Sequence, residues 1–171
     1  NVDTRVSDLS QVVTFITGDN TDGGTKAAEA IAAKIGYTEG ESYEVVVGLT
    51  SATATTNVAR LEGFQAAIEA NYPGIEIVDV AYSESNPQTA ASNVDNWLTK
   101  YPNLDGIFAI DGTNASGAAA ALQAKNLVGK IALVGYDAYP ANVELIKSGV
   151  FTALIAQDPA EEARQAIRTL V

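Results

Sequence analysis

Polar side chains follow several apolar runs of this sequence, and their types are suited to binding hydroxyl groups. Asp111, Asp137 and Gln157 each come after such a run, and Arg60 lies early in a helical segment. Carboxylates and amides accept hydrogen bonds from hydroxyls, whereas a guanidinium donates two in a fixed geometry. These residue types together are typical of a site for a sugar, whose neighbouring hydroxyls both donate and accept.

Each of these residues also has a purely structural interpretation. An aspartate directly after a strand, such as Asp111 or Asp19, is often only the N-cap of the following helix. Arg60 can instead be a solvated residue on the surface of its helix. Trp97 lies on the apolar face of its helix, so we expect it in the core. Asn20, next to Asp19, is a further candidate. The shared position of the polar residues at one edge favours a binding site.

The sequence lacks the groups that most enzyme sites need. It contains no His and no Cys, which removes thiol nucleophiles, Ser–His pairs, disulfides and nearly all zinc sites. Neither GxGxxG nor GxxxxGK[ST] is present. A magnesium-dependent phosphoryl site made by Asp19, Asp111 and Asp137 stays open as an alternative, although no lysine follows any predicted strand. We therefore expect a binding protein rather than an enzyme, with no cofactor and no resident metal.

Composition narrows the class of partner. The formal net charge of −11, with only ten Lys and Arg, argues against a nucleic-acid partner. No apolar run approaches the roughly 18–20 residues that a membrane-spanning helix needs. A length of 171 residues, 47% of them hydrophobic, suits one globular domain. Since the first residue is Asn and no signal peptide is visible, we expect this chain to be a processed or cut piece.

Short β-branched runs alternate with helical stretches along the whole chain. The predicted strands are Val12–Thr17, Glu44–Gly48, Ile75–Tyr82, Gly106–Ile110, Ile131–Gly135 and Thr152–Ala156. Helix starts are marked where Asn86 and Asp158 each precede a proline. This alternation predicts an α/β fold, with a doubly wound, mainly parallel sheet and helices on both faces. Such sheets bind ligands at the carboxyl edge of the strands.

Four blocks of the sequence have a familiar order and spacing. They are TFITGDNTDGGTKAAEAIAAKIG, NVARLEGFQAAIEANYPGIEIV, YPNLDGIFAIDGTNASGAAAAL and IALVGYDAYPANVELIKSGVFTALIAQDP. Together they resemble the periplasmic sugar-binding proteins of the ribose-binding type, the solute receptors of ABC importers. The resemblance implies a type I periplasmic-binding-protein lobe, a sugar ligand, a membrane permease as partner and an extracytoplasmic location. LacI-type repressor cores share this fold, so a regulator's effector-binding core, or a sugar-sensing module, is the alternative.

The resemblance assigns ligand-binding roles position by position. The arginine of the R-x-x-G-F block is Arg60, the aspartate of the G-[FY]-D block is Asp137 and the glutamine of the I-A-Q block is Gln157. The polar residue that ends the GIFA strand is Asp111, where ribose binders often carry Asn. The aspartate of the opening NVDTR stretch is Asp3. The implied site is therefore made of acceptors around one arginine.

Three further residues are candidates for the same site. Ribose binders commonly have arginine directly after the opening aspartate, but here Thr4 separates Asp3 from Arg5, which leaves the role of Arg5 open. Asn20 lies at the same edge of the predicted sheet. Tyr82 is the candidate for the aromatic residue expected after the third strand.

The resemblance also divides the chain. Residues 1–18 correspond to a remnant of the first lobe and the hinge, residues 19–157 to the second, ligand-binding lobe, and residues 158–171 to a helix of the first lobe. One lobe cannot enclose a sugar, so we expect weak sugar binding by this chain and tight binding by a two-lobed parent. The last helix keeps an apolar stripe, for which self-association of the fragment is one outcome. That stripe consists of Ala163, Ala166, Ile167 and Leu170.

Overall fold

Five parallel strands form one sheet in the order β2-β1-β3-β4-β5. The structure, a computed structural model, describes residues 1–170. The strands are β1 (Tyr43–Leu49), β2 (Ile75–Tyr82), β3 (Leu104–Ala109), β4 (Ala132–Tyr136) and β5 (Ala153–Ile155). The helices are α1 (Asn20–Ile35), α2 (Thr55–Asn71), α3 (Pro87–Lys100), α4 (Gly112–Ala124), α5 (Pro140–Lys147) and α6 (Pro159–Leu170). Val171, which ends the predicted region 158–171, lies outside the described residues.

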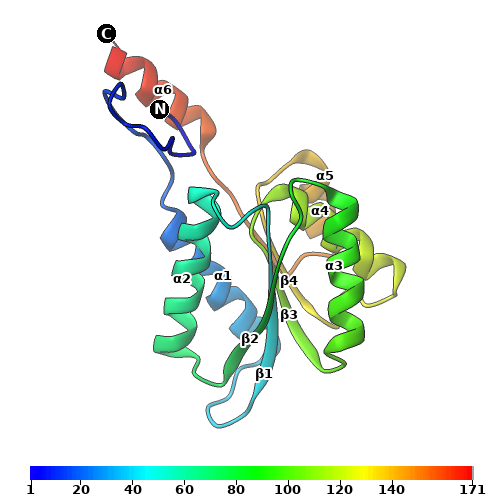
Figure 1. Ribbon diagram of the computed structural model, residues 1–171. Coiled ribbons are helices and arrows are strands. Elements are labelled where there is room, and N and C mark those ends of the chain that lie inside the picture. Colours follow the sequence, from blue (N-terminus) through cyan, green and yellow to red (C-terminus); the bar gives the residue numbers. More distant parts are fainter. Residues whose placement is uncertain (171) are drawn as a thin grey trace.

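Helices cover both faces of the sheet, as the alternation predicts. Figure 1 shows α1 and α2 on one face and α3, α4 and α5 on the other. Successive residues of β1 divide between the two layers: Val45 and Val47 pack with Phe64, whereas Val46 packs with Trp97. This alternation follows from the period of two in a strand. The doubly wound α/β fold is confirmed, and so is the core position of Trp97.

The strand predicted over Val12–Thr17 is wrong. In this segment only Ile16 pairs, in a single parallel bridge with Val2. A strand needs a neighbour that supplies a ladder of hydrogen bonds, and within residues 1–170 the partner here is limited to the few residues around Val2. The last predicted strand is one residue shorter at each end and spans Ala153–Ile155.

The two ends of the chain lie together, apart from the sheet. Residues 1–18 and α6 form a protrusion at one end of the molecule, which contains the N-terminus and the last described residues (Figure 1). Two chain crossings connect the protrusion to the sheet, one into α1 and one out of β5. No residue within Pro159–Leu170 is buried, and its apolar side chains Ile167 and Leu170 are largely exposed. Among residues 1–170, no helix is long and apolar enough to span a membrane.

Candidate binding site at the carboxyl edge of the sheet

The strand order reverses between β1 and β3, and their carboxyl ends lie side by side there. From β1 the chain goes to one neighbour, β2, and later places β3 on the other side of β1. Residues that follow β1 and β3 therefore meet at this edge. Thr50 follows β1 and donates from its hydroxyl to Asp111 Oδ2, 2.8 Å away, just beyond β3.

Asp111 is the N-cap of α4, so the structural interpretation of this residue is confirmed. Its Oδ1 accepts the backbone N–H groups of Thr113 and Asn114 at 3.0 and 2.9 Å. Its Oδ2 accepts from Thr50 and from the Asn114 amide, the latter at 2.7 Å. A carboxylate offers about four acceptor positions, and four donors occupy them here. The Asp111 carboxylate therefore uses its acceptor positions to connect the carboxyl ends of β1 and β3, where the strand order reverses.

Arg60 is buried, with 3% of its surface exposed, which contradicts the solvated alternative. Its Nε donates to Asn20 Oδ1 at 2.8 Å, and its Nη1 donates to the carbonyl oxygen of Ile110 at 2.9 Å. The guanidinium carbon lies 3.6 Å from the centre of the Tyr136 ring, a cation–π geometry. A buried charge needs such partners. Contacts with three separate parts of the chain therefore fix the orientation of the guanidinium.

Asp137, just after β4, is held by groups from two other parts of the chain. Its Oδ1 accepts from Gln157 Nε2 at 2.6 Å, and its Oδ2 accepts from the backbone N–H of Gly112 at 3.1 Å. Its φ of 66° lies in the left-handed region, which aspartate tolerates better than most residues. The carboxylate is thereby aimed across the edge of the sheet.

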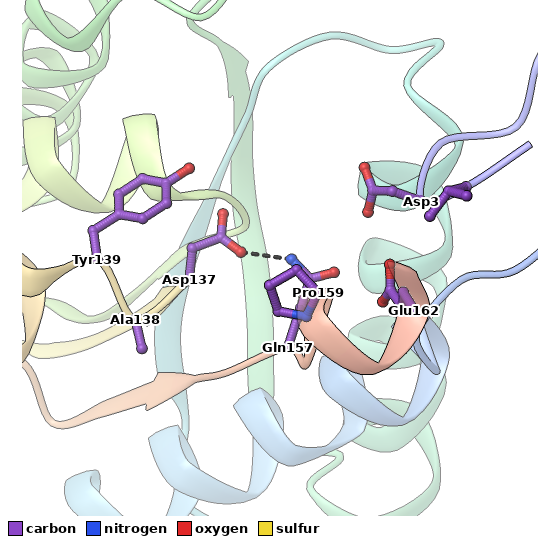
Figure 2. A pocket seen from close by; sticks show the side chains of 8 residues that line it. Asp3, Asp137, Ala138, Tyr139, Gln157, Pro159 and Glu162 are labelled. Atoms are coloured by element: carbon purple, nitrogen blue, oxygen red, sulfur yellow. Dashed lines mark hydrogen bonds between the residues drawn. The ribbon is translucent and has the colours of Figure 1, made fainter. Parts of the chain in front are cut away.

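A cavity of about 460 Å³ opens in front of Asp137, between the sheet and the terminal segments. Figure 2 shows Tyr139 and Asp137 on one side, Asp3 and Glu162 on the other, and Gln157 and Pro159 between them. Small-molecule sites commonly occupy about 300–1,000 Å³. Three carboxylates and an amide make the lining rich in acceptors and unfavourable for anions.

Comparison with known proteins identifies the family. The family model described as "Periplasmic binding protein domain" matches residues 2–171. The chain belongs to the periplasmic binding protein family.

Relatives with assigned ligands are similar over nearly the whole chain. The D-allose-binding periplasmic protein of Escherichia coli is 30% identical over 94% of this chain and 50% of its own length. The ribose import binding protein of Salmonella typhimurium is 33% identical over 91% and 50%. The chain thus spans about half the length of these curated relatives.

Solved structures give the same result. A carbohydrate transporter solute binding protein from Agrobacterium radiobacter, in complex with D-arabinose, has a TM-score of 0.88 at 28% identity, covering 98% of this chain and 57% of its own. An ABC transporter solute binding protein from Agrobacterium vitis with bound D-fucose has a TM-score of 0.89 at 27% identity, covering 99% and 57%. The type I periplasmic-binding-protein fold is therefore confirmed.

Within this family member, the structure brings together only part of the predicted set. Asp3, Asp137 and Gln157 line one cavity, whereas Arg60 and Asn20 form a buried pair beside it. Asn20 is 7% exposed, and its amide is occupied by contacts within the protein.

Two predicted residues lie elsewhere. The exposed Arg5 is anchored through its backbone N–H, which donates to the hydroxyl of Thr55 at 3.1 Å. Tyr82 ends the edge strand β2, is 45% exposed and does not line the cavity. The structure therefore gives Arg5 and Tyr82 no contact with the other candidates that it brings together.

The structure adds residues that sequence reasoning missed. Tyr139, 54% exposed, presents its ring to the cavity and packs on Gly112, where a Cβ would lie 2.3 Å from the Tyr139 ring. The position of Tyr139 two residues after Asp137 was the sequence signal that could have indicated its role. Glu162 comes from α6, and Tyr136 lies under Arg60. Nothing local in the sequence marks these two.

Burial and neighbouring charges at the cavity raise the pKa values of two ionisable groups. Burial raises the pKa of the Glu162 carboxyl, the charge of Asp3 raises it further, and the backbone N–H of Gly18 offsets part of the rise. Burial also raises the pKa of the Tyr139 phenol, with added contributions from the charges of Asp137 and Asp111. The cavity thus disfavours additional negative charge, and the phenol remains a hydrogen-bond donor at neutral pH.

The three aspartates of the magnesium alternative do not form one ligand set. Among residues 1–170, no group of three or more carboxylates is placed to hold a metal ion. Asp19 caps α1 by accepting the backbone N–H of Asp22 at 2.9 Å, while Asp111 and Asp137 accept from the groups described above. Their oxygens accept hydrogen bonds from protein N–H and O–H groups instead.

Proposed function

We propose that this chain supplies one lobe, and short parts of the other, of a solute-binding protein that captures a neutral sugar for an ABC importer. The observation that carries the proposal is the acceptor-rich cavity in front of Asp137, in a chain that belongs to the periplasmic binding protein family. The relatives bind ribose or allose, and the similar solved structures hold D-arabinose or D-fucose. These sugars share vicinal hydroxyls and carry no charge.

Each side chain has a distinct role in this proposal. Asp137, oriented by Gln157, accepts from two neighbouring hydroxyls, and Asp3 accepts from the opposite side of the cavity. The Tyr139 ring packs against a sugar face, since aromatic rings bind the apolar C–H side of a sugar while its hydroxyls point outward. The Nη2 of Arg60, whose other nitrogens are occupied, donates to a ring or hydroxyl oxygen. Asp111 supports the site by fixing the strand ends.

The rest of the site lies outside this chain in this proposal. The chain covers about half of its relatives' length, so we assign residues 19–157 to one lobe and residues 1–18 and 158–171 to the other. Two lobes enclose a ligand and exclude water, which one lobe cannot do. A permease as partner, an extracytoplasmic location and the absence of enzyme activity follow from the same assignment. The named relatives are sugar-import proteins, which favours import over the regulator alternative.

A thermal-shift and calorimetric screen tests the function. A two-lobed parent that includes this sequence is mixed with D-ribose, D-allose, D-arabinose, D-fucose, glucose 6-phosphate and magnesium. A micromolar binder at millimolar sugar gains about 4 kcal/mol of stability, whereas this chain alone is expected to shift little. Asp137→Ala should abolish the shift, and Asp95→Ala, which changes an exposed aspartate paired with Lys125, should not. A response to magnesium or to the phosphate ester, with none to any neutral sugar, contradicts the proposal.

A further inference from the structure

The first chain crossing and the buried arginine are joined by a single side chain. The crossing enters α1 through Thr17, Gly18 and Asp19, and Asn20 is the first helical residue. We propose that Asn20 is a positioning residue that links the backbone of this crossing to the guanidinium of Arg60. The consequence for ligand binding rests on the proposed function, because it requires Arg60 to contact the sugar; the link itself does not.

The Asn20 carboxamide bonds in both directions. Its Nδ2 donates to the Thr17 hydroxyl and to the carbonyl oxygen of Gly18, each at 3.1 Å. Its Oδ1 accepts from Arg60 Nε at 2.8 Å. Arginine only donates, so the amide oxygen has to face Arg60 and the amide nitrogen has to face the crossing. Because the carboxamide is planar and rigid, moving the crossing turns the acceptor that holds Arg60.

Close helix packing fixes the distance across which Asn20 acts. At Gly24 of α1, a Cβ would lie 2.0 Å from the carbonyl oxygen of Arg60, and at Gly63 of α2 one would lie 2.0 Å from the carbonyl oxygen of Thr21. The two backbones therefore touch at two points close in sequence to the Asn20–Arg60 bond. The bond has little room to lengthen, so a change at the crossing is transmitted as a rotation.

The return crossing carries a comparable arrangement. Gln157 lies between β5 and α6, and its amide nitrogen holds Asp137 Oδ1 at 2.6 Å. Gly18 is packed against this second crossing, since a Cβ there would meet Glu162 Oε1 at 3.3 Å and Gln157 Oε1 at 3.9 Å. Each crossing thus supplies one carboxamide to one charged residue of the site. Asn20 is buried and orients Arg60 without lining the cavity, whereas Gln157 holds Asp137 and also lines the cavity.

Hydrogen exchange of the Arg60 Nε–H, followed by NMR on this chain, tests the link without any ligand. Asn20→Ala should speed this exchange by about tenfold or more, because a hydrogen bond to a charged group is lost. Asn20→Asp keeps an acceptor for Arg60 but cannot donate to Thr17 or Gly18, so we expect its exchange to be slower than in Asn20→Ala and faster than in the wild type. Thr17→Val removes one acceptor at the exposed crossing without touching Arg60, and should speed exchange by a smaller factor of about two to three.

Thr38→Val is the matched control, since Thr38 is exposed at the far end of α1. It should leave the Arg60 signal unchanged. Unchanged exchange in Asn20→Ala, or an equal response to Thr17→Val and Thr38→Val, overturns the proposal. Thr17→Val and Asn20→Asp keep the test decisive if Asn20→Ala fails to fold. If the NMR result holds while no neutral sugar binds the two-lobed parent, the positioning role stands and the proposed function fails.

Discussion

The guanidinium of Arg60 lies over the ring of Tyr136, with 3.6 Å between the guanidinium carbon and the ring centre. Arg60 comes from α2 and Tyr136 from the end of β4, so the contact joins a helix to the sheet beside the cavity. Both residues are buried, with exposures of 3% and 2%. The Tyr136 ring thus gives the buried guanidinium a surface to pack against, in addition to its two hydrogen bonds.

Two substitutions of Tyr136 should distinguish the contribution of the ring to stability from that of the hydroxyl. Tyr136→Leu removes the ring, and we expect a loss of about 2 kcal/mol in the free energy of unfolding. Tyr136→Phe keeps the ring and should cost much less. Urea denaturation of both variants measures the difference. Equal losses in the two variants would show that the hydroxyl, not the ring, carries the stability.

Asp111 should be worth more to stability than an ordinary helix cap. Asp111→Ala removes an N-cap and also leaves the Thr50 hydroxyl and the Asn114 amide without their acceptor, so we expect a loss of about 2–3 kcal/mol. Asp19→Ala is the matched control, because its side chain accepts one backbone N–H, that of Asp22, and should cost about 1 kcal/mol. Chemical denaturation checks the order. A smaller loss for Asp111→Ala contradicts the four-donor arrangement.

The backbone contact of α1 and α2 should tolerate no side chain at Gly24. Gly24→Ala places a Cβ 2.0 Å from the Arg60 carbonyl oxygen, and the resulting overpacking should cost about 3 kcal/mol. Gly129→Ala is the comparison, since that site has φ of 76° with open space around it and should cost about 1 kcal/mol through backbone strain. Thermal unfolding of both chains gives the ranking. Equal losses of stability in the two variants would contradict a tight backbone contact at Gly24.

Glu162 should make the protein less stable as pH rises. Its folded pKa is raised by burial and by Asp3, so its contribution is fully present below the usual value of 4.5 and is lost as pH rises through the folded pKa. Glu162→Gln should therefore melt higher than the wild type at pH 7, with the difference vanishing below about pH 4.

Glu161→Gln is the matched control for that pH series. Glu161 pairs with Arg164 at 2.7 Å in the same helix, so its neutralisation should bring no gain. Melting curves between pH 3 and pH 8 distinguish the two variants. A Glu162→Gln variant that melts below the wild type at pH 7 refutes the repulsion between Glu162 and Asp3.

The alternation of apolar runs and helical segments predicted the sheet, its two helical layers and the edge at which the polar residues gather. These follow from periods of two and about 3.6, which a sequence displays locally. The caps at Asn86 and Asp111 were likewise readable, since each needs only the backbone N–H groups two or three residues ahead. The error at Val12–Thr17 has the opposite cause. A strand also needs a partner, and partners lie elsewhere in the chain.

The sequence by itself determined the fold class and which edge of the sheet carries the polar residues. Only the tertiary structure decided that Arg60 is buried rather than solvated, because that depends on how closely two glycines let α1 approach α2. It also decided that Asp111 is fully bonded while Asp137 faces a cavity, and that Asp3 and Glu162 lie across from it. These distances join residues far apart in sequence. They are set by packing, which no local pattern encodes.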